Sequence, residues 1–210
     1  MSDDLRDDTV EPRVLASEVV FAGKVWDIRR ETFALDGHEI VREYMDHTGA
    51  VAVLALDERD RVLLIKQYRH PVRSRDWELP AGLLDFDGES PLEAAKRELA
   101  EEADLLAEHW NLLSEFMTSP GGSNETLRVY LARGVSAAPE VFTRTEEEAG
   151  IELRWVPLDE AVDAVLSRDL QNSILAIAIL SAAAARARGW ETLGDADAAW
   201  PRHPLERQSR

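Results

Sequence analysis

The sequence predicts an α/β protein in which a mixed sheet lies between helices. A small antiparallel sheet is expected N-terminal to this domain in the chain. Two apolar runs, AVAVLAL (50–56) and RVLLIKQYR (61–69), are joined by the polar turn DERD and are typical of buried strands. Ser90-Pro91-Leu92-Glu93 has an N-cap residue, a first-turn proline and a capping-box glutamate, which together predict the start of a helix. Strands, a central helix and later helices in this order favour an α/β sandwich.

The remaining elements follow in chain order. Residues 1–16 are polar and acidic and are expected to be disordered. Residues 17–47 contain SEVVFAG, WDIRRETFAL and HEIVREYM, separated by Gly23 and Asp36-Gly37, a pattern that predicts antiparallel strands. A main domain is expected over 48–193, with a flexible tail over 194–210. Within it we expect further strands at 126–134 and 150–158, and helices at 90–103, 158–167 and 173–188.

Composition narrows the function. The net charge of −17 over 210 residues argues against binding nucleic acid or an anionic membrane surface. An anionic substrate would need local arginines and a divalent metal ion to offset that charge. The chain has no cysteine, which excludes disulfides, thiol nucleophiles and cysteine-ligated metals. The N-terminus is unlike a signal peptide and no uncharged apolar run could span a membrane, so we expect a cytoplasmic protein.

The segment from Gly82 to Leu105, GLLDFDGESPLEAAKRELAEEADL, is the most informative. Residues three and four apart share a helix face, so Glu98, Glu101 and Glu102 should project as one carboxylate cluster. Oxygen clusters of this kind suit hard cations such as Mg²⁺, which bind through few carboxylates, water and substrate phosphates. A solvated acidic helix face is the alternative, and the flanking glycine turn and capping signals make it the weaker interpretation.

This segment resembles the Nudix box, Gly-x5-Glu-x7-Arg-Glu-apolar-x-Glu-Glu-x-Gly-apolar. It departs from the pattern in two places. Six residues, not five, separate Gly82 from Glu89, and Asp104 stands where the family has glycine in a left-handed conformation, which aspartate tolerates comparatively well. The resemblance covers roughly residues 48–188 and implies an α/β/α fold. The matching residues are Gly82, Glu89, Arg97, Glu98, Leu99, Glu101, Glu102 and Leu105.

The resemblance implies roles for the box residues. Glu98 and Glu102 would be metal ligands, and Glu101 a ligand or a bridge to a second metal ion. Arg97 would hold these carboxylates in place through Glu101, although the pair could also be an ordinary surface ion pair. The carbonyl of Ala81 would complete a metal shell. Glu89 would be structural and brace the loop.

A general base for the attacking water is expected in a loop before a late strand. There the sequence has three consecutive acids, Glu146, Glu147 and Glu148. Glu147 is the preferred base and Glu148 the second choice. Three consecutive acids in a loop are also an ordinary solvated run, so this assignment stays open.

Other segments resemble the ADP-ribose pyrophosphatase branch of the family. Pro120 follows Asp104 by 16 residues, and WELPAG (77–82) and QYRHPVR (67–73) precede the box. Arg69 could contact a phosphate, with Arg73 a weaker candidate, because guanidinium is a planar, permanently charged donor. Glu78 could hold a ribose or a water molecule.

The region 17–47 would be the extra N-terminal sheet of this branch, which commonly exchanges between two subunits. Arg42 and Glu43 would meet the nucleotide there, and Trp26 could stack on adenine, although an aromatic residue in a strand more often packs in a core. His47 and His70 lie near these segments but lack paired metal-ligand spacing, which favours structural or rim positions.

The leading hypothesis is therefore a homodimeric enzyme that uses Mg²⁺ or Mn²⁺ to hydrolyse ADP-ribose to AMP and ribose 5-phosphate. A near alternative is the same chemistry on another nucleoside diphosphate sugar or on a dinucleotide. An alternative from another class is a noncatalytic sensor that binds ADP-ribose and regulates a partner. The intact set of box acids argues against the sensor.

Overall fold

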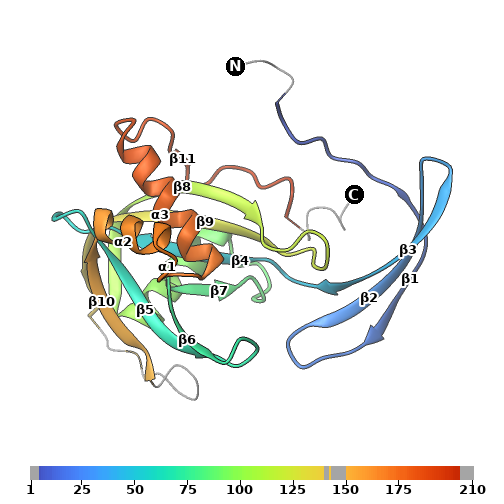
Figure 1. Cartoon of the computed structure of the whole chain (residues 1–210), viewed down its shortest axis with the longest axis horizontal. Helices are drawn as coiled ribbons and strands as arrows, with labels where there is room; N and C mark the ends of the chain where they lie inside the picture. Colours follow the sequence, from blue (N-terminus) through green and yellow to red (C-terminus); the bar gives the residue numbers. More distant parts are fainter. Residues whose placement is uncertain (1–4, 140–141, 143–149, 204–210) are drawn as a thin grey trace. The chain divides into compact units, whose positions relative to one another are not determined.

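The computed structural model describes residues 5–139, 142 and 150–203 (Figure 1). The chain divides into two compact units. The N-terminal unit consists of Met1–His47 together with the short segment Ser119–Asn124, and the main unit consists of Thr48–Thr118 and Glu125–Arg210.

The N-terminal unit is built on a three-stranded antiparallel sheet in the order β1-β2-β3, which confirms the predicted small sheet. Asp36 and Gly37 both have positive φ in the tight turn between the second and third strands, as the Asp-Gly pair predicts. The first strand begins at Arg13, inside the segment that was expected to be disordered. The strands are β1 (Arg13–Phe21), β2 (Asp27–Leu35) and β3 (His38–Asp46).

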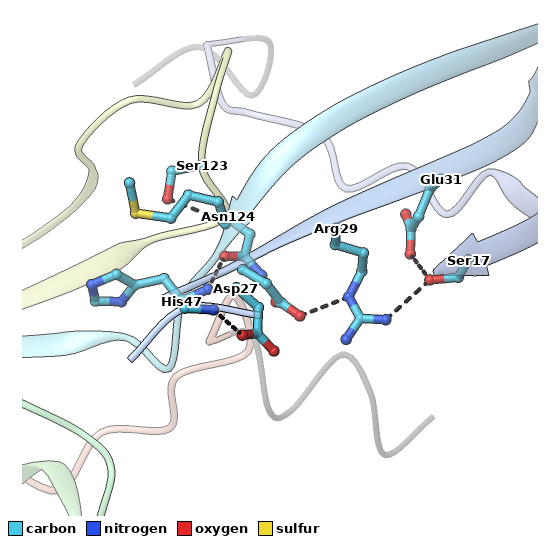
Figure 2. A network of polar contacts seen from close by, with 10 residues as sticks. Ser17, Asp27, Arg29, Glu31, His47, Ser123 and Asn124 are labelled. Atoms are coloured by element: carbon cyan, nitrogen blue, oxygen red, sulfur yellow. Dashed lines mark hydrogen bonds and ion pairs between the residues drawn. The ribbon is translucent and has the colours of Figure 1, made fainter. Parts of the chain in front are cut away.

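A polar network ties the Ser119–Asn124 segment to this sheet (Figure 2). The His47 backbone N–H donates to Asn124 Oδ1 at 2.7 Å, and Asn124 Nδ2 donates to Asp46 Oδ1 at 2.8 Å. The other oxygen of Asp46 accepts from Arg29 Nε at 2.6 Å, and Arg29 Nη1 donates to Ser17 Oγ at 3.1 Å. The segment that contains Pro120 is thereby held by the end of β3, and Asp46 links this contact to β2 through Arg29, which in turn bonds to Ser17 on β1.

The described residues of the main unit form two sheets. A five-stranded mixed sheet has the order β11-β8-β9-β4-β7, in which only the β4–β9 pairing is parallel. A three-stranded antiparallel sheet has the order β10-β5-β6. The strands are β4 (Ala50–Ala55), β5 (Arg61–Arg69), β6 (Ser74–Glu78), β7 (Ala81–Leu83), β8 (Leu105–Met117), β9 (Thr126–Ala137), β10 (Glu152–Pro157) and β11 (Gly194–Asp195).

The helices found among the described residues of the main unit cover its sheets and are α1 (Pro91–Ala103), α2 (Leu158–Leu166) and α3 (Ser173–Arg186). The central strand β4 is buried on both faces because its side chains alternate between two cores. Val51 and Val53 pack in the core that contains α1, whereas Ala52 and Leu54 pack in the core that contains α2 and α3. This two-sided burial confirms the predicted α/β/α sandwich. Among the helices in the described ranges, none combines the length and apolar character that crossing a membrane requires.

The ends of α1 follow from its sequence. Ser90 caps the helix by accepting a hydrogen bond from the Glu93 backbone N–H at 3.2 Å, and Pro91 occupies the first turn. At the other end Asp104 has φ 53° and ψ 38°, the left-handed conformation expected where the family pattern has glycine. Its N–H donates to Ala100 O at 3.0 Å, so the substitution keeps the helix stop.

Sequence patterning missed β6, β7 and the long strand β8. The alternation of β8 is broken by a register shift between Leu112 and Ser114, where the pairing with β9 is irregular. A bulge of this kind moves later side chains to the opposite face, so apolar residues fall next to each other and the period of two is lost. The strand β7 has only three residues, too few for any periodicity.

The expectation of a flexible tail from Gly194 is wrong for the described part of that segment. Gly194 and Asp195 pair with β8. Trp200 is buried and its ring covers the Arg128 guanidinium, with 4.6 Å from Cζ to the ring centroid. Arg128 is itself buried, and its guanidinium also donates to the carbonyls of Ala198 and Ala199 at 2.9 and 3.2 Å. A buried arginine fixes this segment because its N–H groups must be satisfied.

We expect Trp200→Ala to lower the free energy of unfolding by about 3 kcal/mol, because it removes a buried aromatic ring and exposes a buried guanidinium. Chemical denaturation measures this change. Trp200→Phe, which retains an aromatic face, should recover part of the loss. An unfolding midpoint of Trp200→Ala equal to that of the wild type would mean that the segment does not pack in solution.

Candidate active site

The carboxylates of α1 rest against the short strand β7. Glu102 is 5% exposed, and one of its oxygens accepts a hydrogen bond from the Ala81 backbone N–H at 2.8 Å. Glu98 lies over Gly82 so closely that a Cβ atom on Gly82 would stand 1.9 Å from Glu98 Oε1. Glycine is therefore required here for a close approach, and the strand sets how deep the two carboxylates sit.

Arg97 connects α1 to the loop before it through three carboxylates. Its Nε and Nη2 atoms each donate to one oxygen of Glu89 at 3.0 Å, a bidentate pair that braces the loop. Its Nη1 atom donates to Glu98 at 2.6 Å and to Glu101 at 3.1 Å. The sequence anticipated the contact with Glu101 and the bracing role of Glu89. The direct bond to Glu98 was missed, because neighbouring residues on a helix do not face each other.

The environment of Arg97 keeps its charge fixed. The hydrogen bonds with Glu89, and then those with Glu98 and Glu101, raise the pKa of Arg97 although partial burial acts in the opposite direction. The ring of Phe86 lies 4.6 Å from Arg97 Cζ and covers one face of the guanidinium. Sequence reasoning did not find Phe86, which shows no motif signal of its own.

Arg69 and Glu78, predicted separately as a phosphate contact and a ribose contact, form a pair. Arg69 Nε and Nη2 donate to the two oxygens of Glu78 at 2.9 and 2.7 Å. Gln67 Nε2 also donates to Glu78 at 3.1 Å. Glu78 is 4% exposed, whereas the Arg69 side chain is 44% exposed. The buried carboxylate therefore orients an arginine whose outer surface is accessible.

A cavity of about 410 Å³ opens over these groups. Its wall brings together the predicted residues Arg69, Ala81, Arg97 and the three α1 glutamates. The wall contains two guanidinium groups and four carboxylates, so it carries an excess of negative charge. An anionic substrate would be repelled unless a cation is also bound. The carboxylates are those of Asp85, Glu98, Glu101 and Glu102.

The chemistry of these donors fits a hard divalent cation. The wall offers carboxylate oxygens and the backbone of Ala81, and hard cations such as Mg²⁺ prefer oxygen ligands. Within residues 5–139, 142 and 150–203, no three acidic or histidine side chains converge into a ready-made metal cage. Mg²⁺ does not require one, because it commonly binds through one or two carboxylates, water molecules and substrate phosphates.

Four other predicted substrate residues belong to the N-terminal unit. Glu43 pairs across the sheet with Arg30 at 2.6 Å. Arg42 is exposed, and its Nη1 donates to the Val41 carbonyl at 2.8 Å. Pro120 lies in the Ser119–Asn124 segment that Asp46 and His47 hold.

Trp26 stacks on His47, with ring centroids 4.3 Å apart and an angle of 18° between the ring planes. His47 is 5% exposed, which agrees with the structural role favoured for it. His70 instead lies on the surface, where Nδ1 is 3.2 Å from the Tyr68 hydroxyl. Trp26 thus has an aromatic partner on one ring face.

The predicted general bases Glu147 and Glu148, and the neighbouring Glu146, lie outside the described residues. Their assignment stays a prediction. The structure shows one contact near this segment that sequence reasoning missed: the Phe142 backbone N–H donates to Asp104 Oδ1 at 2.9 Å. The aspartate that replaces the family glycine thereby also anchors the chain beyond β9.

Comparison with known proteins shows the family to which the chain belongs. A family model described as NUDIX domain matches residues 46–175, more than half of the chain. The protein belongs to the Nudix family, as the box residues implied. Members of this family generally use divalent metal ions, which agrees with the oxygen donors of the cavity.

Two relatives carry the same name. The chain is 41% identical over 170 residues to the ADP-ribose pyrophosphatase of Mycobacterium tuberculosis (strain ATCC 25618 / H37Rv). The aligned region covers 80% of this chain and 81% of the relative. The chain is 37% identical over 172 residues to the ADP-ribose pyrophosphatase of Bacillus subtilis (strain 168). This alignment covers 81% of this chain and 92% of the relative. The matches thus extend over most of each protein.

A crystal structure of an ADP compounds hydrolase has the same fold. It superposes with a TM-score of 0.71 and covers 88% of this chain and 99% of that chain. The two sequences are 22% identical, so this similarity bears on the fold alone.

We expect Gly82→Ala to displace the Glu98 carboxylate, because the new Cβ would overlap it. The side chain can swing away, so the melting temperature should change little while metal-dependent activity falls roughly 100-fold. Leu166→Ala, at an exposed position on α2 outside the cavity, is the control and should keep full activity. Full activity in Gly82→Ala would show that the position of Glu98 over Gly82 is not needed.

Proposed function

We propose that the protein is a hydrolase that cleaves ADP-ribose into AMP and ribose 5-phosphate, with Mg²⁺ or Mn²⁺ as the metal ion. One water molecule is consumed for each diphosphate bond broken. The observation that carries this proposal is the set of α1 carboxylates held by Arg97 in one cavity with Arg69. The two relatives named ADP-ribose pyrophosphatase support the choice of substrate.

In this proposal Glu98, Glu101, Glu102 and the Ala81 carbonyl hold the metal. A bound divalent ion would neutralise diphosphate charge and lower the pKa of a coordinated water. Glu102 is already oriented by the Ala81 N–H, and Glu98 by the surface of Gly82. The ligands therefore come from a rigid helix and a short strand, which favours a reproducible geometry.

Arg97 and Arg69 have different roles in this proposal. Arg97 is occupied by Glu89, Glu98 and Glu101, so we assign it the positioning of the carboxylates. Arg69 is oriented from behind by Glu78 and is exposed on its outer side, which suits contact with a substrate phosphate. This changes the role proposed for Glu78: it acts on the substrate through Arg69.

For the adenosine half we retain Trp26, Arg42, Glu43 and Pro120 as proposed contacts. Trp26 is supported by its stacked geometry on His47, which presents a fixed aromatic ring to a nucleobase. The network that holds the Ser119–Asn124 segment gives Pro120 a rigid support. Glu43 is paired with Arg30, so Glu43 would have to bind Arg30 and the nucleotide at the same time.

We further propose that the protein acts as a homodimer in which a second copy covers the N-terminal sheet. Every residue of β1 is exposed within the chain. A small sheet is stabilised mainly by covering a hydrophobic face, and apolar side chains exposed together on one sheet often mark a surface for a partner. Most soluble oligomers are symmetric assemblies of identical chains, so we infer that the partner is a second copy of this chain. The exposed apolar side chains of the sheet are Val14, Leu15, Val19, Val20, Phe21 and Val41.

The function is tested by incubating the protein with ADP-ribose and Mg²⁺ and identifying the products. We expect AMP and ribose 5-phosphate, and we expect Glu98→Gln and Glu102→Gln each to reduce kcat at least roughly 100-fold without unfolding the protein. Glu191→Gln, which changes an exposed acid outside the cavity, is the control.

Other results would favour the alternatives. A higher kcat/KM for NADH, a diadenosine polyphosphate or another nucleoside diphosphate sugar would replace the substrate. Tight binding of ADP-ribose without cleavage under any divalent metal would favour the noncatalytic sensor. Near-normal Mg²⁺-dependent activity in Glu98→Gln or Glu102→Gln would remove that residue from the metal site.

The general base is tested by comparing Glu147→Gln with Glu148→Gln. A base acts in the transition state, so the correct change should lower kcat roughly 100-fold and leave KM almost unchanged. We expect Glu147→Gln to be the damaging change. A silent Glu147→Gln beside a damaging Glu148→Gln would shift the assignment by one residue.

The dimer is tested by sedimentation of a Val19→Asp/Phe21→Asp double variant. Both side chains are exposed on β1, and two buried charges at an interface should convert the dimer to a monomer. Leu166→Asp, an exposed position on α2, serves as the control and should remain dimeric. A wild-type protein that sediments as a monomer at micromolar concentration would contradict the proposal.

A further inference from the structure

The turn that carries Pro120 is paired with the end of β3. The Ser119 carbonyl accepts from the Gly122 N–H at 2.9 Å, so Pro120 occupies the second position of a tight turn, which suits its fixed φ. The Met45 N–H then donates to the Gly122 carbonyl at 2.9 Å, and the Met45 carbonyl accepts from the Asn124 N–H at 3.3 Å. These residues all belong to the N-terminal unit, in which the chain after the turn runs parallel to the end of β3.

The Asn124 side chain secures this pairing with both ends of its amide (Figure 2). Its Oδ1 atom accepts from the His47 backbone N–H at 2.7 Å, and its Nδ2 atom donates to Asp46 Oδ1 at 2.8 Å. A backbone N–H can only donate and an ionised carboxylate can only accept, so these two partners fix the orientation of the amide. The Asp46 side chain is 15% exposed, and its other oxygen accepts from Arg29 Nε at 2.6 Å. An amide fits this position because it supplies an acceptor and a donor together.

The tip of the turn depends on this anchor. Pro120, Gly121 and Gly122 are exposed, and a Cβ atom on either glycine would meet no atom within 4 Å. Glycine has more backbone freedom than any other residue, so two in succession allow the tip many conformations unless hydrogen bonds restrain it. The two short hydrogen bonds of the Asn124 amide supply that restraint at the end of the turn.

We propose that Asn124 is a positioning residue for substrate binding, and that its bond to Asp46 holds the Pro120 turn in the conformation that receives the nucleotide. The inference rests on the proposed function, since it needs ADP-ribose as the substrate and Pro120 as one of its contacts. Asn124 does not touch the substrate and acts through the turn. Asp46 and Arg29 act in the same way, because they orient the acceptor that the amide binds. The N-terminal sheet thereby contributes to nucleotide affinity through the turn that it holds.

The test exchanges the two groups of the Asn124–Asp46 pair. Asn124→Asp sets two carboxylates against each other. In Asp46→Asn the new oxygen stays with Arg29, so the new NH₂ group faces the NH₂ group of Asn124. The double variant Asp46→Asn/Asn124→Asp again places a donor opposite an acceptor and keeps an acceptor for the His47 N–H. It has the same net charge as the wild type, and all of these changes conserve side-chain shape.

We expect each single variant to raise KM for ADP-ribose about tenfold and to keep kcat within about threefold of the wild type, because the turn affects binding and the α1 carboxylates are unchanged. The double variant should return KM to within about threefold of the wild-type value. One single variant adds a negative charge and the other removes one, so a rise of KM in both cannot come from overall charge. Steady-state kinetics measures these values, and circular dichroism checks folding.

Asn111→Asp is the matched control. Asn111 on β8 accepts from Arg133 Nη2 at 3.1 Å, which a carboxylate can also do, so its KM and kcat should equal those of the wild type. Wild-type KM in both single variants, changes of KM in opposite directions, or a folded double variant that does not recover would each overturn the role of Asn124. Unfolding of a single variant would assign the pair to folding and overturn it as well. A wild-type protein that does not cleave ADP-ribose would instead refute the proposed function, and this inference with it.

Discussion

The site depends on one interaction, the contact of Arg97 with Glu89, Glu98 and Glu101. Like charges three and four residues apart destabilise a helix, and α1 places such charges on a single face. Arg97 offsets that repulsion and also joins the loop before the helix to the helix itself. Because these groups are partly buried, loss of the arginine would leave carboxylates without compensation in a poorly hydrated place.

The depth of the carboxylates is set by β7 and not by the helix alone. Glu102 is bound by the Ala81 N–H, and Glu98 occupies the volume that a side chain on residue 82 would fill. The helix fixes the angle between the Glu98 and Glu102 side chains. Contact with β7 fixes how far their carboxylates lie from that strand. Both restraints are needed if these oxygens are to hold, in one geometry, a cation that also binds a phosphate.

Local signals in the sequence predicted the elements that have local causes. The caps of α1, the Asp36-Gly37 turn and the shared face of Glu98, Glu101 and Glu102 all depend on residues within four positions of one another. The failures have distant causes. β8 is obscured by a bulge whose position depends on its partner β9. The buried segment around Trp200 is fixed by Arg128, about seventy residues earlier in the chain.

The pairing of Arg69 with Glu78 could not be predicted for the same reason, because it requires the register of β5 against β6. This pairing changes the net charge of the whole cavity. A carboxylate buried behind Arg69 removes part of the positive charge that a diphosphate would otherwise meet, while α1 adds further negative charge in front. The cavity therefore binds an anion well only when a cation is present. In the proposed function, this charge balance would make metal and substrate binding mutually dependent, and the dependence would follow from the charges of the whole wall.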